Sequence, residues 1–374
     1  MLLGALSTAL FLVVAAAALV GDERVLENLA PTFVWVVFWV GLVPLVVLFG
    51  NLWAVLSPFR AVADAVAWVA DRLGVEWRPE PYPGRLGRWP AALLLFAFVA
   101  MELVYESPAD PRALALAIYL YAAITWLGMF VFGRRAWLEG GEAFHVYFGL
   151  LGRIAPFGVV DGRVVSRAPL SGLATVTVTP GTLALVAVML GSVGFDSVSR
   201  TSFWLDLQLE AGGELGRTAI GFAGLVGTVV AVALAYLAAV AAARAVTGHS
   251  KRLATAFVTS LVPIALVYVI AHYFSLLLVQ GQYLVPLVSD PFGRGWDLLG
   301  TAAFQPNLGL LTPNLVWYVQ VGVLVAGHVA GLALAHDRAV GLFRTPGYAT
   351  RSQYAMLVLM VLYTVGGMRL LATS

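Results

Sequence analysis

The strongest constraint on this chain is a series of apolar segments, each long enough to cross a bilayer. A helix rises about 1.5 Å per residue, so about 20 apolar residues span a hydrocarbon core about 30 Å thick. We expect an all-α, polytopic membrane protein with about nine transmembrane helices in a single domain, residues 1–374. The predicted spans are 2–20, 32–50, 90–105, 112–132, 176–195, 218–243, 254–284, 314–336 and 354–372.

The composition fits a membrane protein and excludes several other classes. Hydrophobic residues make up 61% of the chain and charged residues 11%, whereas soluble domains have roughly 45–50% and about 25%. A net charge of +2 is too small to favour nucleic acid. The absence of cysteine excludes disulfides and thiolate metal sites. The expected environment is therefore the lipid bilayer of the cell membrane, crossed several times.

The basic residues predict an orientation for these spans. Most of the 22 Lys and Arg residues lie in alternate connections, namely 51–89, 133–175, 244–253 and 337–353. Cytoplasmic connections carry an excess of Lys and Arg. We therefore expect a cytoplasmic N-terminus and an external C-terminus.

Two of the cytoplasmic connections, 51–89 and 133–175, have structure of their own. Residues 52–73 form an amphipathic pattern typical of a helix that lies in the membrane interface, and 139–155 have a similar, shorter pattern. Asp161-Gly162 lies between two short apolar runs, which indicates a small β-hairpin near 157–166 on the cytoplasmic face.

His272 is the first candidate for chemistry because an ionisable side chain is costly deep in a bilayer. Tyr268, Ser275 and Gln282 share its helical face. This polar stripe must face protein or water, and could line a path for substrate or protons. The ordinary alternative is a packing histidine bonded to a neighbouring helix.

His328 is the second candidate, in the next predicted span. It lies within Gly327-His-Val-Ala-Gly331, a spacing that lets helices approach closely, with Gln320 further outward. If the two spans are antiparallel neighbours, both histidines lie at matching depth. Two imidazoles at the same depth are able to hold a divalent transition metal such as zinc, copper or iron together with a third ligand, and a proton relay is the alternative role.

Three carboxylates on the external side are candidates for that third ligand or for a general base. They are Asp196, Asp290 and Asp297. Each also has an ordinary interpretation as a turn residue or a solvated acid at the membrane boundary. Glu142 and His145 have the Glu-x-x-His spacing of di-iron bundles, but a single copy is weak evidence.

Several motifs across the chain resemble a family of integral membrane proteins known as fenitrothion hydrolase-like. The resemblance implies a membrane-bound hydrolase of organophosphate esters, and it assigns no catalytic residue. The motifs are Gly50-Asn-Leu-Trp53, Gly141-Glu-Ala-Phe144, Phe195-Asp-Ser197, Ala271-His-Tyr-Phe-Ser275, Ser289-Asp-Pro291 and Gly327-His-Val-Ala-Gly331.

Three functions remain open from the sequence. The first is a membrane-embedded hydrolase of small apolar esters, in which the two histidines either bind a metal ion or activate water. The second is a transporter or channel in which the same side chains line a substrate or proton path. The third is a non-catalytic or haem-binding subunit of a membrane complex. The oligomeric state is not predicted by any feature of the sequence.

Overall fold

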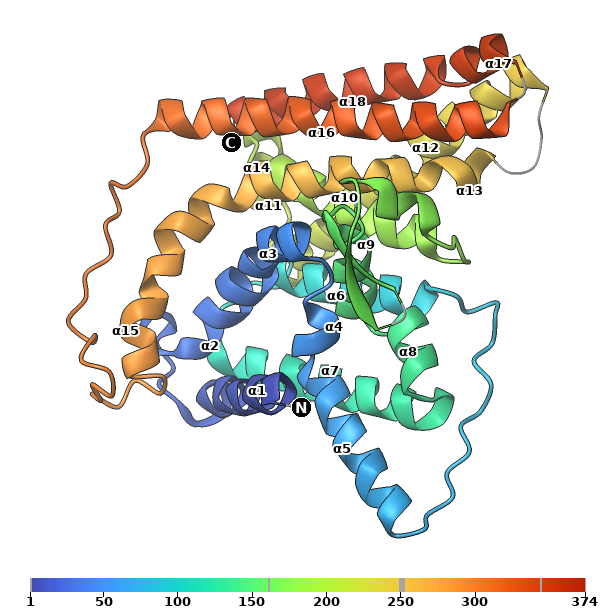
Figure 1. The fold of residues 1–374 in the computed structure, drawn as a ribbon. Helices are drawn as coiled ribbons and strands as arrows, with labels where there is room; N and C mark the ends of the chain where they lie inside the picture. Colours follow the sequence, from blue (N-terminus) through green and yellow to red (C-terminus); the bar gives the residue numbers. More distant parts are fainter. Residues whose placement is uncertain (1, 161, 249–252, 344, 374) are drawn as a thin grey trace. The chain divides into compact units, whose positions relative to one another are not determined.

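The computed structural model describes residues 2–160, 162–248, 253–343 and 345–373, and nearly all of its regular secondary structure is helical (Figure 1). Seven helical stretches are long and apolar enough to cross a membrane, so the prediction of an all-α polytopic membrane protein is confirmed. The other two predicted spans also form helices, one of 15 residues and one of 20. The count of nine spans stays a prediction. The seven stretches are Leu2–Val20, Leu29–Phe49, Pro111–Phe132, Thr182–Ser199, Glu214–Thr247, Leu253–Ser289 and Pro313–Leu342.

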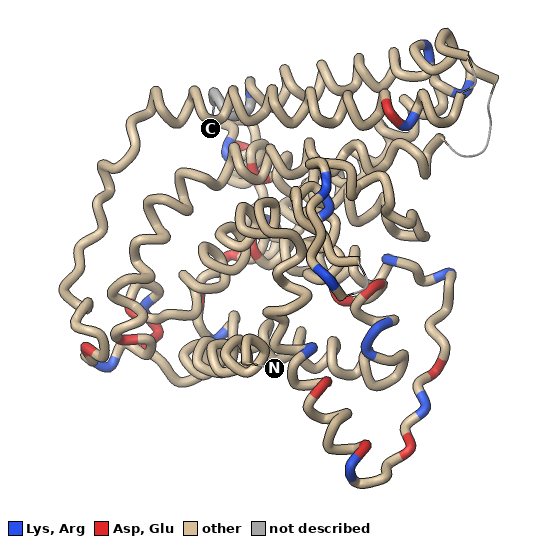
Figure 2. The backbone as a smooth tube through the Cα atoms, in the orientation of Figure 1, with Lys and Arg blue, Asp and Glu red and all other residues tan. Residues whose placement is uncertain are grey.

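The packing divides the chain into two compact units, and the prediction of a single domain remains untested. Unit 1 contains residues 1–91, 107–152 and 273–313, and unit 2 contains the remainder. Two helices contribute to both units: α6 (Trp89–Leu103) and α14 (Val262–Gln280). Lys, Arg, Asp and Glu lie mostly at helix ends and in connections, which leaves the long helices nearly uncharged (Figure 2).

Unit 1 is built around the contacts of α1 with α5, α7 and α2. Its connecting segments are fixed by side-chain caps at helix starts. Asp110 accepts a bond from Ala113 N (2.7 Å) before Pro111, and Ser57 accepts one from Arg60 N (3.3 Å) before Pro58. The elements are α1 (Leu2–Val20), η1 (Val25–Glu27), α2 (Leu29–Thr32), the π-helical η2 (Phe33–Gly41), α3 (Leu42–Phe49), α4 (Trp53–Leu56), α5 (Pro58–Arg72), α7 (Pro111–Phe132), α8 (Arg134–Gly140), α9 (Ala143–Leu151), η5 (Gly281–Tyr283) and α15 (Leu284–Ser289).

Unit 2 is organised by helix α10, which packs against α12 and α18. Gly191 of α10 lies so close to α12 that an added Cβ would be 2.6 Å from Val229 Cα. This is the close approach that small residues permit between membrane helices. The elements are β1 (Phe157–Val160), β2 (Arg163–Ser166), η3 (Ser171–Thr175), α10 (Thr182–Ser199), α11 (Ser202–Glu210), α12 (Glu214–Thr247), α13 (Leu253–Phe257), η4 (Val258–Leu261), α16 (Pro313–Leu342), α17 (Pro346–Arg351) and α18 (Tyr354–Thr373).

The predicted hairpin is present as the antiparallel pair β1 and β2. Phe157 pairs with Ser166 and Val160 with Arg163. Gly162 has a φ of 75°, the left-handed conformation that favours glycine in a tight turn. The other predicted turn residue, Asp161, lies outside the described residues.

Candidate functional site

The central feature of unit 2 is a buried pair formed by His272 on α14 and Asp196 on α10. The His272 Nε2 atom lies 2.5 Å from Asp196 Oδ2. Both side chains are only 7% exposed. An isolated buried charge is very costly, whereas a hydrogen-bonded pair offsets much of that cost. The structure therefore brings together one predicted metal ligand and one predicted catalytic carboxylate.

Arg200 links this pair to the surface of unit 2. Its Nε is 3.1 Å from Asp196 Oδ1, and one terminal nitrogen is 3.4 Å from Oδ2. The side chain of Arg200 is 55% exposed. Asp196 and Arg200 are one helical turn apart at the C-terminal end of α10, where a cation is also favoured by the helix dipole. The result is a short polar chain that runs from solvent to a buried imidazole.

The carboxylate is held in place by the packing around the end of α10. Phe195 contacts Trp204 of α11 edge to face, with ring centroids 5.2 Å apart. Thr201 accepts a bond from Trp204 N (3.4 Å) and so caps α11. An added Cβ at Gly224 of α12 would overlap Phe195 and Trp204, so α12 closes over these rings.

His328 lies in a different environment on α16. Its Nδ1 donates to the Leu324 carbonyl (2.7 Å), and its ring meets the Tyr268 ring edge to face at 5.9 Å. The residue is 8% exposed. Its Nε2 has no hydrogen-bond partner among the described residues. A buried acceptor without a partner typically costs about 1–3 kcal/mol.

The antiparallel packing of α14 and α16 is confirmed, but the depths of the two histidines differ. Tyr268 faces His328, and Gln320 donates to the Ala271 carbonyl (3.1 Å), so the two helices run in opposite directions. His272 lies one turn beyond Tyr268, about 6 Å along the axis at 1.5 Å per residue. The expectation of matching depth is therefore off by about one turn.

Tyr268 and Gln320 were predicted to line a substrate path, and both form bonds between helices. Tyr268 OH donates to the Tyr363 carbonyl (2.6 Å), and Tyr363 OH donates to the Leu190 carbonyl (3.2 Å). Helices α10, α14, α16 and α18 are thus connected around this position. The role of Tyr268 and Gln320 in a substrate or proton path stays a prediction.

The other predicted site residues belong to unit 1. Ser275 is half-buried on α14. Gln282 fixes the loop after α15, because it donates to the Asn307 carbonyl (3.2 Å) and accepts from Asn307 N (2.9 Å). Gln282 therefore has a structural partner, and its place on a substrate path stays a prediction.

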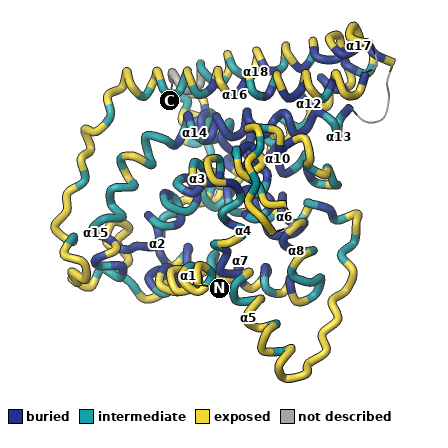
Figure 3. Tube along the Cα trace, viewed as in Figure 1, coloured by how far each residue is buried: buried dark blue, intermediate teal, exposed yellow. Residues whose placement is uncertain are grey.

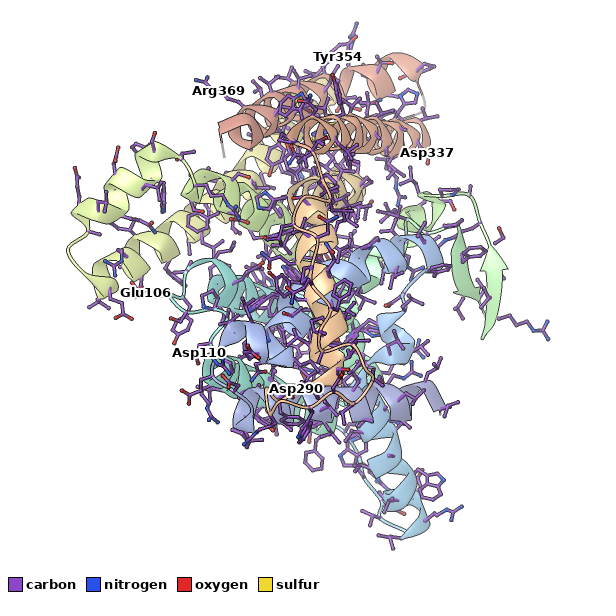
Figure 4. The ribbon with its side chains drawn as sticks, turned by 90° about the vertical axis from the view of Figure 1, so that its left-hand side faces the viewer. Glu106, Asp110, Asp290, Asp337, Tyr354 and Arg369 are labelled. Atoms are coloured by element: carbon purple, nitrogen blue, oxygen red, sulfur yellow. The ribbon has the colours of Figure 1, made fainter. Side chains whose placement is uncertain are left out.

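Asp290, labelled in Figure 4, lies in the loop that follows α15, and Asp297 belongs to the same loop. Asp290 accepts bonds from three backbone N–H groups, those of Arg294 (2.9 Å), Gly295 (2.6 Å) and Trp296 (3.1 Å). Asp297 accepts from Ala302 N (3.0 Å), and this bond is the main reason that its pKa is lowered. Both carboxylates have the backbone partners expected of turn residues, and their catalytic role remains untested.

A further buried carboxylate, Glu142, lies in unit 1, and its Glu-x-x-His spacing is only a weak signal in the sequence. Glu142 is fully buried and caps α9, where it accepts from Phe144 N (3.2 Å) and His145 N (2.5 Å). It also accepts from Trp53 Nε1 (3.2 Å) and from the Tyr121 hydroxyl. Burial raises the pKa of Glu142 and lowers that of His145 to about 4. The Glu-x-x-His spacing here reflects a helix cap whose carboxylate reaches α4 and α7.

The described residues contain no group of three or more His, Asp or Glu side chains that could hold a metal ion. His272 is already bonded to Asp196, and His328 contributes a single open nitrogen. The part of the chain that the structure describes therefore provides no set of ligands for the predicted zinc, copper or iron ion. The metal site stays a prediction.

Comparison with known proteins gives no relative from which a role could be transferred. Protein-family models, curated proteins and solved structures all yield no match. The fold alone defines the class, a polytopic α-helical membrane protein. The His272–Asp196 pair is the feature of this fold that calls for a functional explanation.

Proposed function

We propose that the chain is a membrane-embedded hydrolase of small apolar esters, with His272 as its general base. The observation that carries this proposal is the 2.5 Å contact of His272 with Asp196 inside apolar helices. A buried carboxylate orients an imidazole and stabilises the imidazolium that forms when it takes a proton. The resemblance to fenitrothion hydrolase-like proteins supports an organophosphate ester as substrate.

The reaction that fits this pair is attack of water on the ester phosphorus. Water forms the new phosphorus–oxygen bond, and its proton passes to His272. The bond to the leaving alcohol breaks, and the alcohol receives that proton. Asp196 holds the imidazole throughout, while Arg200 balances the charge of Asp196. No step is assigned to a metal ion, because the residues described do not form a ligand set.

The first test is hydrolysis of a chromogenic aryl dialkyl phosphate by the purified protein in phospholipid vesicles. The variant is His272→Gln, and the control is His336→Gln, which changes an exposed histidine on α16. Loss of a general base typically lowers the rate by about 10²–10⁴-fold. Equal rates in wild type and His272→Gln, or no hydrolysis by wild type, would reject the proposal. Elemental analysis of the same samples tests the separate prediction that the protein binds zinc, copper or iron.

A transporter is the second candidate, because the longest apolar stretch contains irregular turns. Two 3₁₀ segments interrupt Leu253–Ser289, η4 next to Pro263 and η5 at Gly281–Tyr283. Such stretches often mark a hinge in a helix. The buried His272–Asp196 pair would then carry a proton across the bilayer. Proton uptake into vesicles that depends on His272, without ester cleavage, would favour this function.

We further propose nine spans in the cell membrane, with the N-terminus in the cytoplasm. Support comes from contacts within each unit, which join connections predicted on the same side. Three contacts join connections that are predicted to be external: the ion pairs Arg112–Glu23 and Arg217–Glu106, and the hydrogen bond from Arg294 to the Val20 carbonyl. Two contacts join connections that are predicted to be cytoplasmic: the ion pair Arg134–Asp64 and the hydrogen bond from Arg338 to the Ala174 carbonyl.

This topology is testable with single cysteines, because the chain has none of its own. A membrane-impermeant maleimide should label Ser107→Cys and Gly212→Cys from outside intact cells. It should label Glu139→Cys and Arg163→Cys only after the membrane is permeabilised. The opposite pattern at any of the four positions would reject the proposed orientation.

A further inference from the structure

Helix α5 and its C-cap, Leu73, carry an apolar stripe whose distal part is exposed among the described residues. Val62, Val66, Val69 and Leu73 lie within about 60° of one another at 100° per residue. Val66 is 63% exposed, Val69 46% and Leu73 74%. Ala67 and Asp71 lie on the opposite face. Figures 1 and 4, which differ by a 90° turn, both show α5 protruding from the other helices of unit 1. Figure 3 shows that the distal half of α5 is exposed.

The first turns of α5 are fixed to transmembrane helices. Trp126 of α7 donates to the Phe59 carbonyl (3.2 Å), and the ring of Phe59 meets that of Phe11 on α1 at 5.3 Å. Asp64 pairs with Arg134, the first residue of α8, which Gly133 separates from the end of α7. The start of α5 is therefore held at the C-terminal end of α7.

The chain returns to the same end of α7 after the stripe. Trp77 stacks on Phe130, with ring centroids 6.0 Å apart and planes at 19°. Glu80 N donates to the Val131 carbonyl (2.7 Å). Both partners lie in the last turn of α7. Residues 65–73 can extend only about 14 Å from this end at 1.5 Å per residue, so the stripe must remain near the membrane surface.

We propose that this stripe binds the bilayer itself, at the boundary of headgroups and acyl chains beside the end of α7. An amphipathic helix in this position buries its apolar face about 5–10 Å deep. Trp77, four residues beyond the stripe, is 38% exposed, and tryptophan is enriched at this boundary. Trp68 lies about 130° from the centre of the stripe, and Arg72 is over its ring at 4.1 Å.

The charges of α5 predict which kind of phospholipid is sufficient to bind the stripe. The helix carries two arginines, Arg60 and Arg72, and two aspartates, Asp64 and Asp71. Arg60 is paired with Asp64 at 3.5 Å. Because these charges balance, attachment depends on the apolar stripe, and zwitterionic phospholipid is enough to bind it. Anionic lipid is not required.

The experiment places one nitroxide label at a time on the full-length, cysteine-free chain. The stripe variants are Val66→Cys, Val69→Cys and Leu73→Cys, and the matched controls on the opposite face are Ala67→Cys and Asp71→Cys. Each protein is reconstituted in phosphatidylcholine vesicles. Electron paramagnetic resonance then measures collisions with oxygen, which concentrates in lipid, and with a water-soluble nickel chelate.

The three stripe labels should collide often with oxygen and rarely with the nickel chelate, and the two controls should show the reverse. Frequent nickel collisions at all five positions would place the stripe in water and overturn the proposal. Rare collisions with both reagents at the stripe would mean that protein covers it, for example a second copy of the chain, and would overturn the proposal equally.

Discussion

At the residue scale, Glu142 is a fully buried carboxylate that joins three elements of unit 1. It accepts four hydrogen bonds from three separate elements. Replacing it by alanine leaves those donors without an acceptor, so Glu142→Ala should lower the free energy of unfolding by at least about 1–3 kcal/mol. Thermal unfolding in detergent measures this change.

Glu139→Ala is the matched control for that experiment. Glu139 is a neighbouring glutamate whose side chain is 63% exposed and pairs with the exposed Arg135. Surface pairs of this kind contribute little. Equal unfolding temperatures for the two variants would show that Glu142 does not stabilise the unit.

His145 makes stability depend on pH in a defined direction. Its pKa is lowered to about 4, mainly by burial, with Arg60 contributing, whereas the unfolded chain has a value near 6.5. Between these values the unfolded state binds more protons, so stability rises with pH from about 4 to 6.5 and is lost on acidification. His145→Gln should flatten the rise.

The measurement is the free energy of unfolding in detergent at several pH values, for wild type and His145→Gln. The raised pKa of Glu142 gives the opposite slope above its unfolded value, because the folded state then binds more protons. This contribution is common to both proteins, so their difference isolates His145. Parallel curves for the two proteins would contradict the assignment.

At the element scale, the contact of α10 with α12 positions Asp196. An added Cβ at Gly191 would lie 2.6 Å from the Val229 backbone, so Gly191→Ala must separate the two helices. Overpacking of this kind typically costs about 1–3 kcal/mol. Unfolding temperature and ester hydrolysis should both fall in this variant.

Gly227→Ala provides the control on α12 itself. No atom lies within 4 Å of an added Cβ at Gly227. There the better helix propensity of alanine should leave stability unchanged or raise it by up to about 1 kcal/mol. If Gly191→Ala behaves like Gly227→Ala, the close helix contact does not exist.

At the scale of the whole molecule, the sequence predicts what depends on local composition. Apolar length predicts the seven helical stretches that are long enough to cross a membrane, and Asp161-Gly162 predicts the hairpin. The antiparallel contact of α14 with α16 was an assumption about two consecutive spans, and the structure shows it. Each of these features is determined within one element or between neighbours in sequence.

The site could be predicted only in part, because its partners are far apart in sequence. Asp196 and His272 were both candidates, but three aspartates were equivalent until packing brought one of them to His272. Asp290 and Asp297 bond to backbone N–H groups of their own loop, which residue type does not reveal. The site around Glu142 includes Trp53 and Tyr121, and no pattern of sequence spacing predicts their contact with Glu142.

The most direct test of the central claim is a double-mutant cycle on ester hydrolysis in vesicles, with His272→Gln, Asp196→Asn and the double variant. If the two side chains act as one general base, each single change should lower the rate by about 10²–10⁴-fold, and the double change should lower it little further. Retention of the wild-type rate by either single variant, or losses that multiply in the double variant, would contradict a shared catalytic role.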